Sequence, residues 1–293
     1  MRITGHRILD LAAQSTLSAQ SKVADVQNQL TSGERVTTPS DDPTAWVAAQ
    51  RTKLRQVMSQ GTGAAVAANR DALEVTDNSL ASIGSVVAQV RELAVQASSD
   101  TYNAQGRAGL AAQVQGLFQS AVDSANARAP DGSFVLAGSN SLSAPFDTAG
   151  VYTGDAAQRA VASNSSAQTL GNISIAGASL TAAHGVDVLP LLGKVATALA
   201  ANDTNALRAT LPDLETAIKQ VSTARSQAGG AINVLDATNS ARTTLEANMT
   251  DAISRFTGVD TVASASELAQ AGQSLQVSQA VTTRLIQLLA PSN

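Results

Sequence analysis

Hydrophobic side chains recur at alternating spacings of three and four residues through most of this chain, a pattern typical of helices packed side by side. Gly33 and Pro39 follow the first such stripe, and both residue types end helices, so we expect the first helix to end near Ser32. This first stripe consists of Leu9, Ala12, Thr16, Ala19, Val23, Val26 and Leu30.

The segment after this helix predicts the start of another one. An aspartate in the run Pro39-Ser40-Asp41-Asp42-Pro43 can accept hydrogen bonds from free backbone N–H groups, and Pro43 suits the first helical position. A divalent metal pair at the two aspartates is the alternative, but no third acidic ligand follows at calcium-loop spacing. We therefore interpret Gly33, Ser40, Asp41, Asp42 and Pro43 as a helix-capping motif.

Three longer helical stretches follow from the same spacing. One runs from Val66 to Ala97, and the next returns from Leu110 toward Ala129, where Pro130-Asp131-Gly132 favours a turn. The third stretch, from Leu207 to Phe256, contains Pro212, which is expected to break off its first part. A last stripe indicates a C-terminal helix through Leu268, Ala271, Leu275, Ser278, Thr282, Leu285 and Leu289.

Gly229 and Gly230 interrupt the third stretch. Each glycine costs about 1 kcal/mol in a helix relative to Ala. Two explanations are open: a neighbouring backbone approaches closely at this point, or the helix is softened there.

Between the helical stretches, residues 131–189 are rich in Gly, Ser, Asn and Thr and predict a small β-rich domain. The candidate strands are Phe134-Val135-Leu136, Val151-Tyr152-Thr153 and Ile173-Ser174-Ile175. The expected fold class is mainly α: a long antiparallel coiled-coil-like bundle of N- and C-terminal segments, with this domain inserted in the middle. We expect a terminal helical assembly domain of residues 1–35 and 260–293, and a long-helix bundle of residues 40–130 and 190–257.

Composition changes the interpretation of the two terminal stripes. The chain of 293 residues is 44% hydrophobic but only 2% aromatic, and alanines supply much of the stripes. Because so little bulky side chain is available to offset the conformational entropy of ordering, we expect both ends to stay largely disordered in an isolated subunit and to become helical against other copies. The predicted subunit-interface residues are Leu9, Ala12, Ala19, Val23, Val26, Leu30, Leu268, Ala271, Leu275, Leu285 and Leu289.

The composition also argues against several classes of function. The chain has no cysteine, and its two histidines, His6 and His184, are far apart, so we expect no disulfide, metal site, cofactor or catalytic residue, and no enzyme activity. A net charge of −4 without a basic cluster argues against nucleic-acid binding. No apolar run approaches the ~20 residues of a membrane span, and the N-terminal residues hold no signal-peptide core.

Several segments of this sequence are similar to those of a known protein family. Thr31-Ser32-Gly33-Glu34-Arg35-Val36, followed by Pro39-Ser40-Asp41-Asp42-Pro43, resembles the signature of the flagellin superfamily. The prolines around the acidic pair and the opening Met1-Arg2-Ile3-Thr4 resemble the branch of hook–filament junction proteins, the third hook-associated proteins. Further similar segments are Gly132 to Gly138, Pro145-Phe146, Tyr152 to Asp155, Arg225 to Gly229, Ser274 to Ser278 and Leu288-Leu289-Ala290, whereas Val161 to His184 matches almost nothing.

The resemblance implies a structural adaptor of the extracellular bacterial flagellum, secreted unfolded through the flagellar export apparatus without a cleavable signal peptide. Implied partners are further copies in a ring or helical layer, another hook-associated protein, flagellin, and an export chaperone that binds Leu275, Leu285, Leu288 and Leu289. Filament flagellin is the first alternative. A cytoplasmic coiled-coil signalling module is the second, because long antiparallel helices with Ala-rich heptads also suit it.

Overall fold

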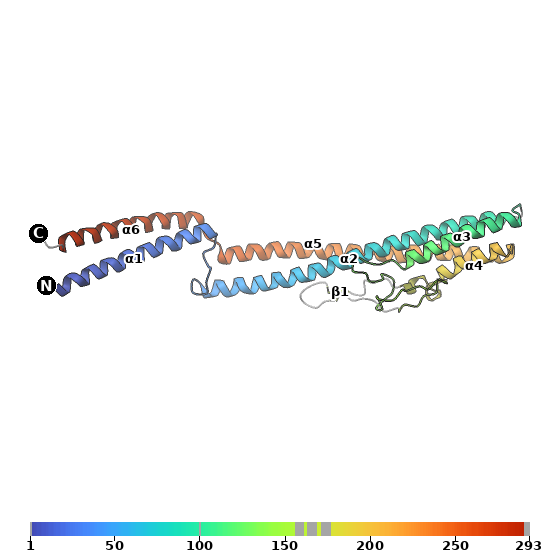
Figure 1. Ribbon diagram of the computed structural model, residues 1–293, viewed down its shortest axis with the longest axis horizontal. Coiled ribbons are helices and arrows are strands. Elements are labelled where there is room, and N and C mark those ends of the chain that lie inside the picture. The colour runs from blue at the N-terminus through green and yellow to red at the C-terminus, as the bar shows by residue number, and fades with distance from the viewer. Residues whose placement is uncertain (1, 100, 156–160, 163–168, 171–176, 290–293) are drawn as a thin grey trace. The chain divides into compact units, whose positions relative to one another are not determined.

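Six α-helices carry the fold in the computed structural model, which describes residues 2–99, 101–155, 161–162, 169–170 and 177–289. The mainly helical fold class is therefore confirmed (Figure 1). The helices are α1 (Arg2–Ser32), α2 (Pro43–Ala97), α3 (Ala104–Ala125), α4 (Val188–Ala200), α5 (Thr204–Thr257) and α6 (Thr261–Leu289).

The chain divides into two units. The terminal unit comprises Met1–Val57 and Leu245–Asn293, and the central unit comprises Met58–Thr244. Helices α2 and α5 contribute residues to both units.

In the terminal unit, α1 and α6 pack against each other in antiparallel directions, so the start of α1 lies beside the end of α6 (Figure 1). The less exposed residues of α1 recur with the three-and-four spacing of the predicted stripe. In α6 the same holds for the stripe that begins at Leu268. Each terminal stripe thus lies on the face where its helix meets the other terminal helix, a surface that we call the terminal seam.

The central unit contains the main hydrophobic core, to which α2, α3, α4 and α5 all contribute. The largest side chains are fully buried because their helices place leucine, isoleucine or valine at many inward positions, with alanine at most of the others. Representative members are Leu80, Ile83, Val87, Val90, Val114, Phe118, Leu189, Leu192, Val195, Leu199, Leu207, Leu214 and Val221.

The predicted β-rich domain is not supported. The described strands between α3 and α4 are two residues long, β1 (Val161–Ala162) paired antiparallel with β2 (Thr169–Leu170), and they are followed by the 3₁₀ helices η1 (Gly177–Leu180) and η2 (Ala182–His184). The candidate strand at Ile173-Ser174-Ile175 lies outside the described residues.

The other two strand candidates form turns and single bridges instead of ladders. Arg128 bridges Phe134, and Phe146 bridges Tyr152. Gly132, Gly138 and Gly150 all have positive φ, so a tight turn interrupts the backbone within a few residues of each apolar run. The apolar side chains of this segment join the helical core, for example Leu136, Phe146 and Leu180.

The prediction that Pro212 interrupts the third helical stretch is wrong. Helix α5 runs unbroken from Thr204 to Thr257 with Pro212 inside it. A proline in a helix interior costs about 3 kcal/mol, but the fully buried Leu207 and Leu214 anchor α5 on either side of it. Tertiary burial therefore outweighs the local preference.

Gly229 and Gly230 also lie inside α5, and the structure decides against one of the two explanations for them. A Cβ atom placed on either glycine would meet no other atom within 4 Å. No neighbouring backbone therefore approaches closely there, and softening of the helix is the explanation that stays a prediction.

Candidate assembly interface

The capping motif lies where the chain leaves α1 and enters α2. Gly33 follows the last residue of α1 with a φ of 73°, a left-handed conformation that glycine adopts without strain. Pro43 is the first residue of α2. Asp42 precedes it, and its Oδ1 accepts a hydrogen bond from Ala45 N at 3.0 Å, which supplies a partner for one free N–H group of the first turn.

Asp41 and Ser40 act on the loop rather than on the helix. Asp41 Oδ2 accepts hydrogen bonds from Thr38 N at 2.8 Å and from Thr37 N at 3.0 Å. These backbone bonds, Thr38 first, lower the pKa of the Asp41 carboxyl. Ser40 Oγ lies 2.8 Å from Thr38 Oγ1. The backbone bond from Ala45 is the main reason that the pKa of Asp42 is also lowered.

The loop after α1 is bonded to the turn that joins α5 to α6. Arg35 N donates to Thr257 O at 2.6 Å, and Val259 N donates to Gly33 O at 3.0 Å. Val36 is almost completely buried beside this pairing. The loop from α1 to α2 and the turn from α5 to α6, which we call the chain crossings, therefore hold each other in place.

The terminal seam accounts for most of the predicted interface residues. Leu9, Ala12, Ala19, Val23 and Leu30 are half-buried, and Val26 is buried. In α6, Leu268, Leu275 and Leu285 are half-buried and Ala271 is buried, whereas the side chain of Leu289 lies outside the described residues. Within this chain these residues face the other terminal helix, and their role toward another subunit stays a prediction.

The terminal seam is thin. Among the described side chains, Val26 and Ala271 are the buried hydrophobic residues of α1 and α6. Lys22 and Glu267 form an ion pair across it at 3.0 Å, but both side chains are about half exposed or more, which leaves such a pair worth little. Few buried side chains therefore hold the two terminal helices together.

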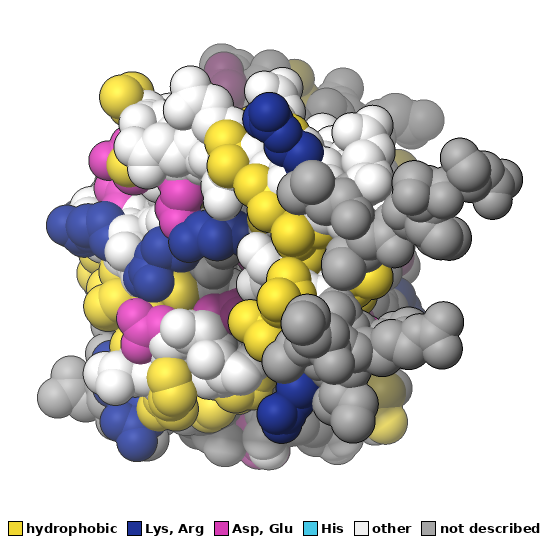
Figure 2. Space-filling view, turned by 90° about the vertical axis from the view of Figure 1, so that its left-hand side faces the viewer, with side chains coloured by type: hydrophobic (Ala, Val, Ile, Leu, Met, Phe, Trp, Pro, Cys, Tyr) yellow, Lys and Arg dark blue, Asp and Glu magenta, His cyan; other side chains and the backbone are white. Residues whose placement is uncertain are grey.

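Large apolar side chains also lie on the outside of the terminal helices, where the stripe analysis did not place them. Leu11 is 72% exposed, Leu17 66% and Val277 63%. Figure 2, seen from the end where the two termini lie, shows hydrophobic side chains at the surface between charged ones. Their spacing puts these side chains on more than one side of the two helices, and exposed apolar side chains can form contacts with other subunits. We call this set the outer apolar face: Ile8, Leu11, Leu17, Val262, Val277, Val281 and Ile286.

Two of the four residues predicted to bind a chaperone are only partly accessible. Leu275 and Leu285 lie half-buried on the terminal seam. The side chains of Leu288 and Leu289 lie outside the described residues. A partner that binds Leu275 and Leu285 must therefore bind α6 in a state in which α6 is not packed against α1.

Two buried polar residues of the central unit escaped the sequence analysis. Arg107 donates to Ala97 O at 2.9 Å, to Ser99 O at 2.9 Å and to Asn202 Oδ1 at 2.7 Å, so it joins the turn after α2 to the turn after α4. Gln220 of α5 bonds the backbone of the segment around η1 and η2. Each occupies a buried position of its helix, which a search for hydrophobic residues alone passes over.

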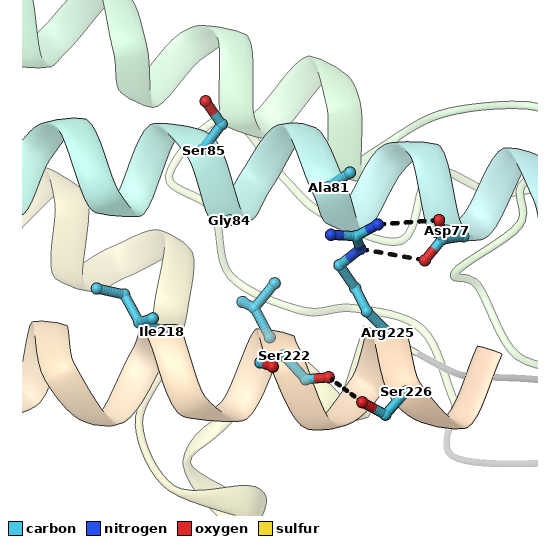
Figure 3. Close-up of a pocket in the computed structure, with 9 residues that line it drawn as sticks. Asp77, Ala81, Gly84, Ser85, Ile218, Ser222, Arg225 and Ser226 are labelled. Carbon is cyan, nitrogen blue, oxygen red and sulfur yellow. Dashed lines mark hydrogen bonds and ion pairs between the residues drawn. The ribbon is translucent and has the colours of Figure 1, made fainter. Parts of the chain in front are cut away.

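An open groove lies between α2 and α5 in the central unit, with a volume of 430 Å³. Asp77 and Arg225 pair at one end of it through two contacts of 3.1 Å (Figure 3). The rest of the lining consists of Ile218, Val221 and the small residues Ala81, Gly84, Ser85, Ser222 and Ser226.

Catalytic and metal chemistry finds little support in the described part of the chain. No group of three or more His, Asp or Glu side chains there could hold a metal ion. His184 is exposed in η2, with Nδ1 3.0 Å from Ala178 O, and the side chain of His6 lies outside the described residues. The helices that are described also lack any segment long and apolar enough to cross a membrane.

Comparison with known families matches both ends of the chain. Residues 6–141 match the bacterial flagellin N-terminal helical region, and residues 211–289 match the bacterial flagellin C-terminal helical region. The first match covers α1, the capping motif, α2 and α3, and the second covers most of α5 and α6.

Two relatives share about half of their length with this chain. The flagellar hook-associated protein 3 of Salmonella typhimurium is 30% identical over 157 residues, which is 53% of this chain and 49% of that protein. The protein of the same name from Escherichia coli is 28% identical over 159 residues, 53% of this chain and 50% of that protein. The chain thus spans about half the length of these relatives.

Solved structures show the same fold. A putative flagellar hook-associated protein from Vibrio parahaemolyticus superposes with a TM-score of 0.67 at 19% identity, over 74% of this chain and 100% of that one. FlgL from Xanthomonas campestris does so with a TM-score of 0.60 at 17% identity, over 70% and 99%.

Proposed function

We propose, from the premise that this chain belongs to the flagellin superfamily, that it is a structural subunit of the bacterial flagellum and joins the hook to the filament. The observation that carries the proposal is the match to two proteins named flagellar hook-associated protein 3. The shared fold with hook-associated proteins supports it. A structural role, without catalysis, follows from the family.

Assembly would use the terminal unit. Helices α1 and α6 pair along the terminal seam and leave the outer apolar face exposed. Burying such side chains against neighbouring copies is favourable by about 1.5–3 kcal/mol for each large one. We therefore assign the contacts between subunits to the outer apolar face. The residues of the terminal seam hold α1 and α6 together so that this face stays exposed. Repeated heterologous contacts of this kind build a ring or a helical layer.

A strain that lacks the gene provides the test. The unaltered chain should restore motility, and without it flagellin should be secreted as monomers instead of being retained as filaments. Leu11→Asp and Leu17→Asp together should prevent rescue, because each places a charge on the outer apolar face. Leu142→Asp is the matched control, since Leu142 is 87% exposed in the central unit. Full rescue by the double variant would contradict the interface assignment, and retained filaments in the strain without the gene would contradict the junction role.

Filament flagellin is the second candidate, because the two matched regions are those of bacterial flagellin. The two functions differ in what the purified chain forms. Electron microscopy of concentrated protein should show no long self-supporting filaments if the chain is an adaptor, whereas such filaments would favour flagellin. Family membership removes the support for a cytoplasmic coiled-coil signalling module.

Export in an unfolded state, with release into the extracellular flagellum, completes the proposal. In that state α6 is separated from α1, so Leu275, Leu285, Leu288 and Leu289 become available to an export chaperone. Leu275→Asp with Leu285→Asp should weaken capture of the chaperone, whereas Val277→Asp with Val281→Asp, on the exposed side of α6, should weaken it less. If truncation after Gln273 leaves chaperone binding intact, the C-terminal site is wrong.

A further inference from the structure

Three hydroxyl groups meet in the terminal seam. Thr16 Oγ1 of α1 lies 2.9 Å from Ser278 Oγ and 3.1 Å from Thr282 Oγ1, both of α6. Thr16 Oγ1 also donates to Ala12 O of its own helix at 2.9 Å. We call Thr16, Ser278 and Thr282 the hydroxyl layer.

The geometry gives Thr16 one hydrogen bond across the terminal seam. A threonine hydroxyl has one hydrogen to donate and two lone pairs that accept. Thr16 donates its hydrogen to Ala12 O, so it accepts from Ser278. Thr282 donates its own hydrogen to Ser278 O at 2.8 Å and lies in contact with Thr16. The bond from Ser278 to Thr16 forms only while these two residues lie opposite one another.

Apart from the backbone bonds at the chain crossings, little along the terminal seam defines the register. Every other member of the predicted α1 stripe is apolar, and several members of both stripes are alanines, which differ little in shape from one position to the next. The exposed Lys22–Glu267 pair adds little. The backbone bond between Val259 and Gly33 holds one end of the terminal seam, whereas Thr16 lies midway along α1.

A slip by one heptad preserves the apolar spacing but separates the hydroxyl layer. At 1.5 Å per residue, seven residues move α6 by about 10 Å. Thr16 would then lie opposite Ala271 and Leu275, or opposite Leu285 and Leu289, none of which can bond its hydroxyl group through a side chain. The one lost hydrogen bond corresponds to about a five-fold preference for the native register.

We propose that the hydroxyl layer is the element that selects the register of the terminal helices. A single polar position in a coiled-coil seam fixes register at the expense of stability, because apolar side chains would pack more favourably there. The proposal therefore predicts two effects of replacing the hydroxyl layer with apolar side chains. The helix content of the terminal pair should stay the same or rise, and slipped pairings of α1 and α6 should become more frequent.

Disulfide trapping measures the register directly, since the chain has no cysteine of its own. By the antiparallel pairing around Thr16, Ala19 comes opposite Leu275, so Ala19→Cys with Leu275→Cys reports the native register. Ala19→Cys with Leu268→Cys reports a slip in one direction, and Val26→Cys with Leu275→Cys a slip in the other. A displacement of about 10 Å exceeds the Cα separation that a disulfide spans, so each pair reports one register.

The full-length chain with its native hydroxyl layer should form the disulfide at the native pair at least five-fold more than at either slipped pair. The triple change Thr16→Val, Ser278→Ala and Thr282→Val should lower this ratio about five-fold, without loss of helical circular dichroism. Thr283→Val is the matched control, because exposed Thr283 bonds only Gln279 O of its own helix, at 2.8 Å, and it should leave the ratio unchanged.

Two results would overturn the proposal. One is a triple variant that still forms the disulfide only at the native pair, since other contacts would then define the register. The other is a chain with the intact layer that forms all three disulfides equally. The trapping is done on the chain without other flagellar proteins, in conditions where circular dichroism shows that its terminal helices are formed, so its result does not depend on the proposed function.

Discussion

Gln220 gives the most direct test of how the segment between α3 and α4 is held to the helices. Its side chain is 8% exposed. Nε2 donates to Ser179 O at 2.8 Å, to Thr181 O at 3.0 Å and to Val186 O at 3.2 Å, and Oε1 accepts from Val186 N at 2.9 Å. One amide group thus supplies partners to a segment that has almost no regular backbone pairing of its own.

Gln220→Glu keeps the shape of this side chain and removes both donor hydrogens. Each buried carbonyl that loses its donor costs about 1–3 kcal/mol, so the two hydrogens together correspond to about 2–6 kcal/mol, and the carboxylate charge facing carbonyl oxygens adds to the loss. We expect the free energy of unfolding to fall by that amount at neutral pH. The loss should shrink in acid, where a protonated carboxyl regains one donor hydrogen.

Urea unfolding followed by far-UV circular dichroism measures the effect. Gln227→Glu is the matched control, because Gln227 lies two turns further along α5 and is exposed. The control change should alter the unfolding free energy by less than about 0.5 kcal/mol. If the two variants unfold at the same urea concentration, the reasoning about Gln220 is refuted.

Other predictions concern glycine, tyrosine and aspartate positions. Gly229→Ala and Gly230→Ala should each raise the free energy of unfolding by about 1 kcal/mol, because a Cβ meets no atom there, and a lower urea midpoint would count against the helix interpretation. Burial raises the pKa of the Tyr152 phenol to about 12, so absorbance titration of a Tyr102→Phe chain, which keeps one tyrosine, should show a midpoint near 12. Because the unfolded chain releases that proton first, stability should fall as the pH rises above 10.0, and a titration midpoint at 10.0 would contradict this. Backbone hydrogen bonds lower the pKa of Asp41, so its contribution to stability is present above 3.8 and is lost as the pH falls through the lower folded value. Asp41→Asn, which cannot ionise, should make the acid dependence of the thermal midpoint shallower, and an unchanged dependence would argue against this role.

Local signals allowed the helix ends to be predicted. Gly33 adopts the left-handed conformation that ends α1, and Pro43 opens α2. These features depend on the conformational limits of one or two residues, which the sequence displays directly. Pro212 shows the opposite case, since its local preference is overruled by burial of Leu207 and Leu214 elsewhere in the core.

The candidate interface could be predicted only in part. Spacing identifies the face of α1 that packs on another helix, but not whether that helix belongs to the same chain. The structure places this face on α6 and leaves Leu11 and Leu17 outside, where no periodic pattern marks them. Gln220 and Arg107 were missed because a buried polar side chain is recognised by its partners, which are distant in sequence.

The strand candidates around Leu136 and Tyr152 failed for a physical reason as well. Tyr152 has a residue type common in strands, and its ring lies 5.2 Å from that of Phe146 between centroids. Both side chains pack on the helical core instead of on a sheet. Propensity therefore located some residues of the core, such as Leu136, but not the backbone conformation that buries them, and Val151 is 50% exposed.

Hydrogen exchange on the dilute monomer and on the assembled protein tests the central claim most directly, because it reports the stability of α1 and α6 separately from that of the central unit. The terminal seam buries few hydrophobic residues, among them Val26 and Ala271, so we predict fast amide exchange in both terminal helices of the monomer and strong protection after assembly. Amides of α3 should be protected in both states. Terminal helices as well protected in the monomer as α3 would contradict the claim that neighbouring subunits stabilise them.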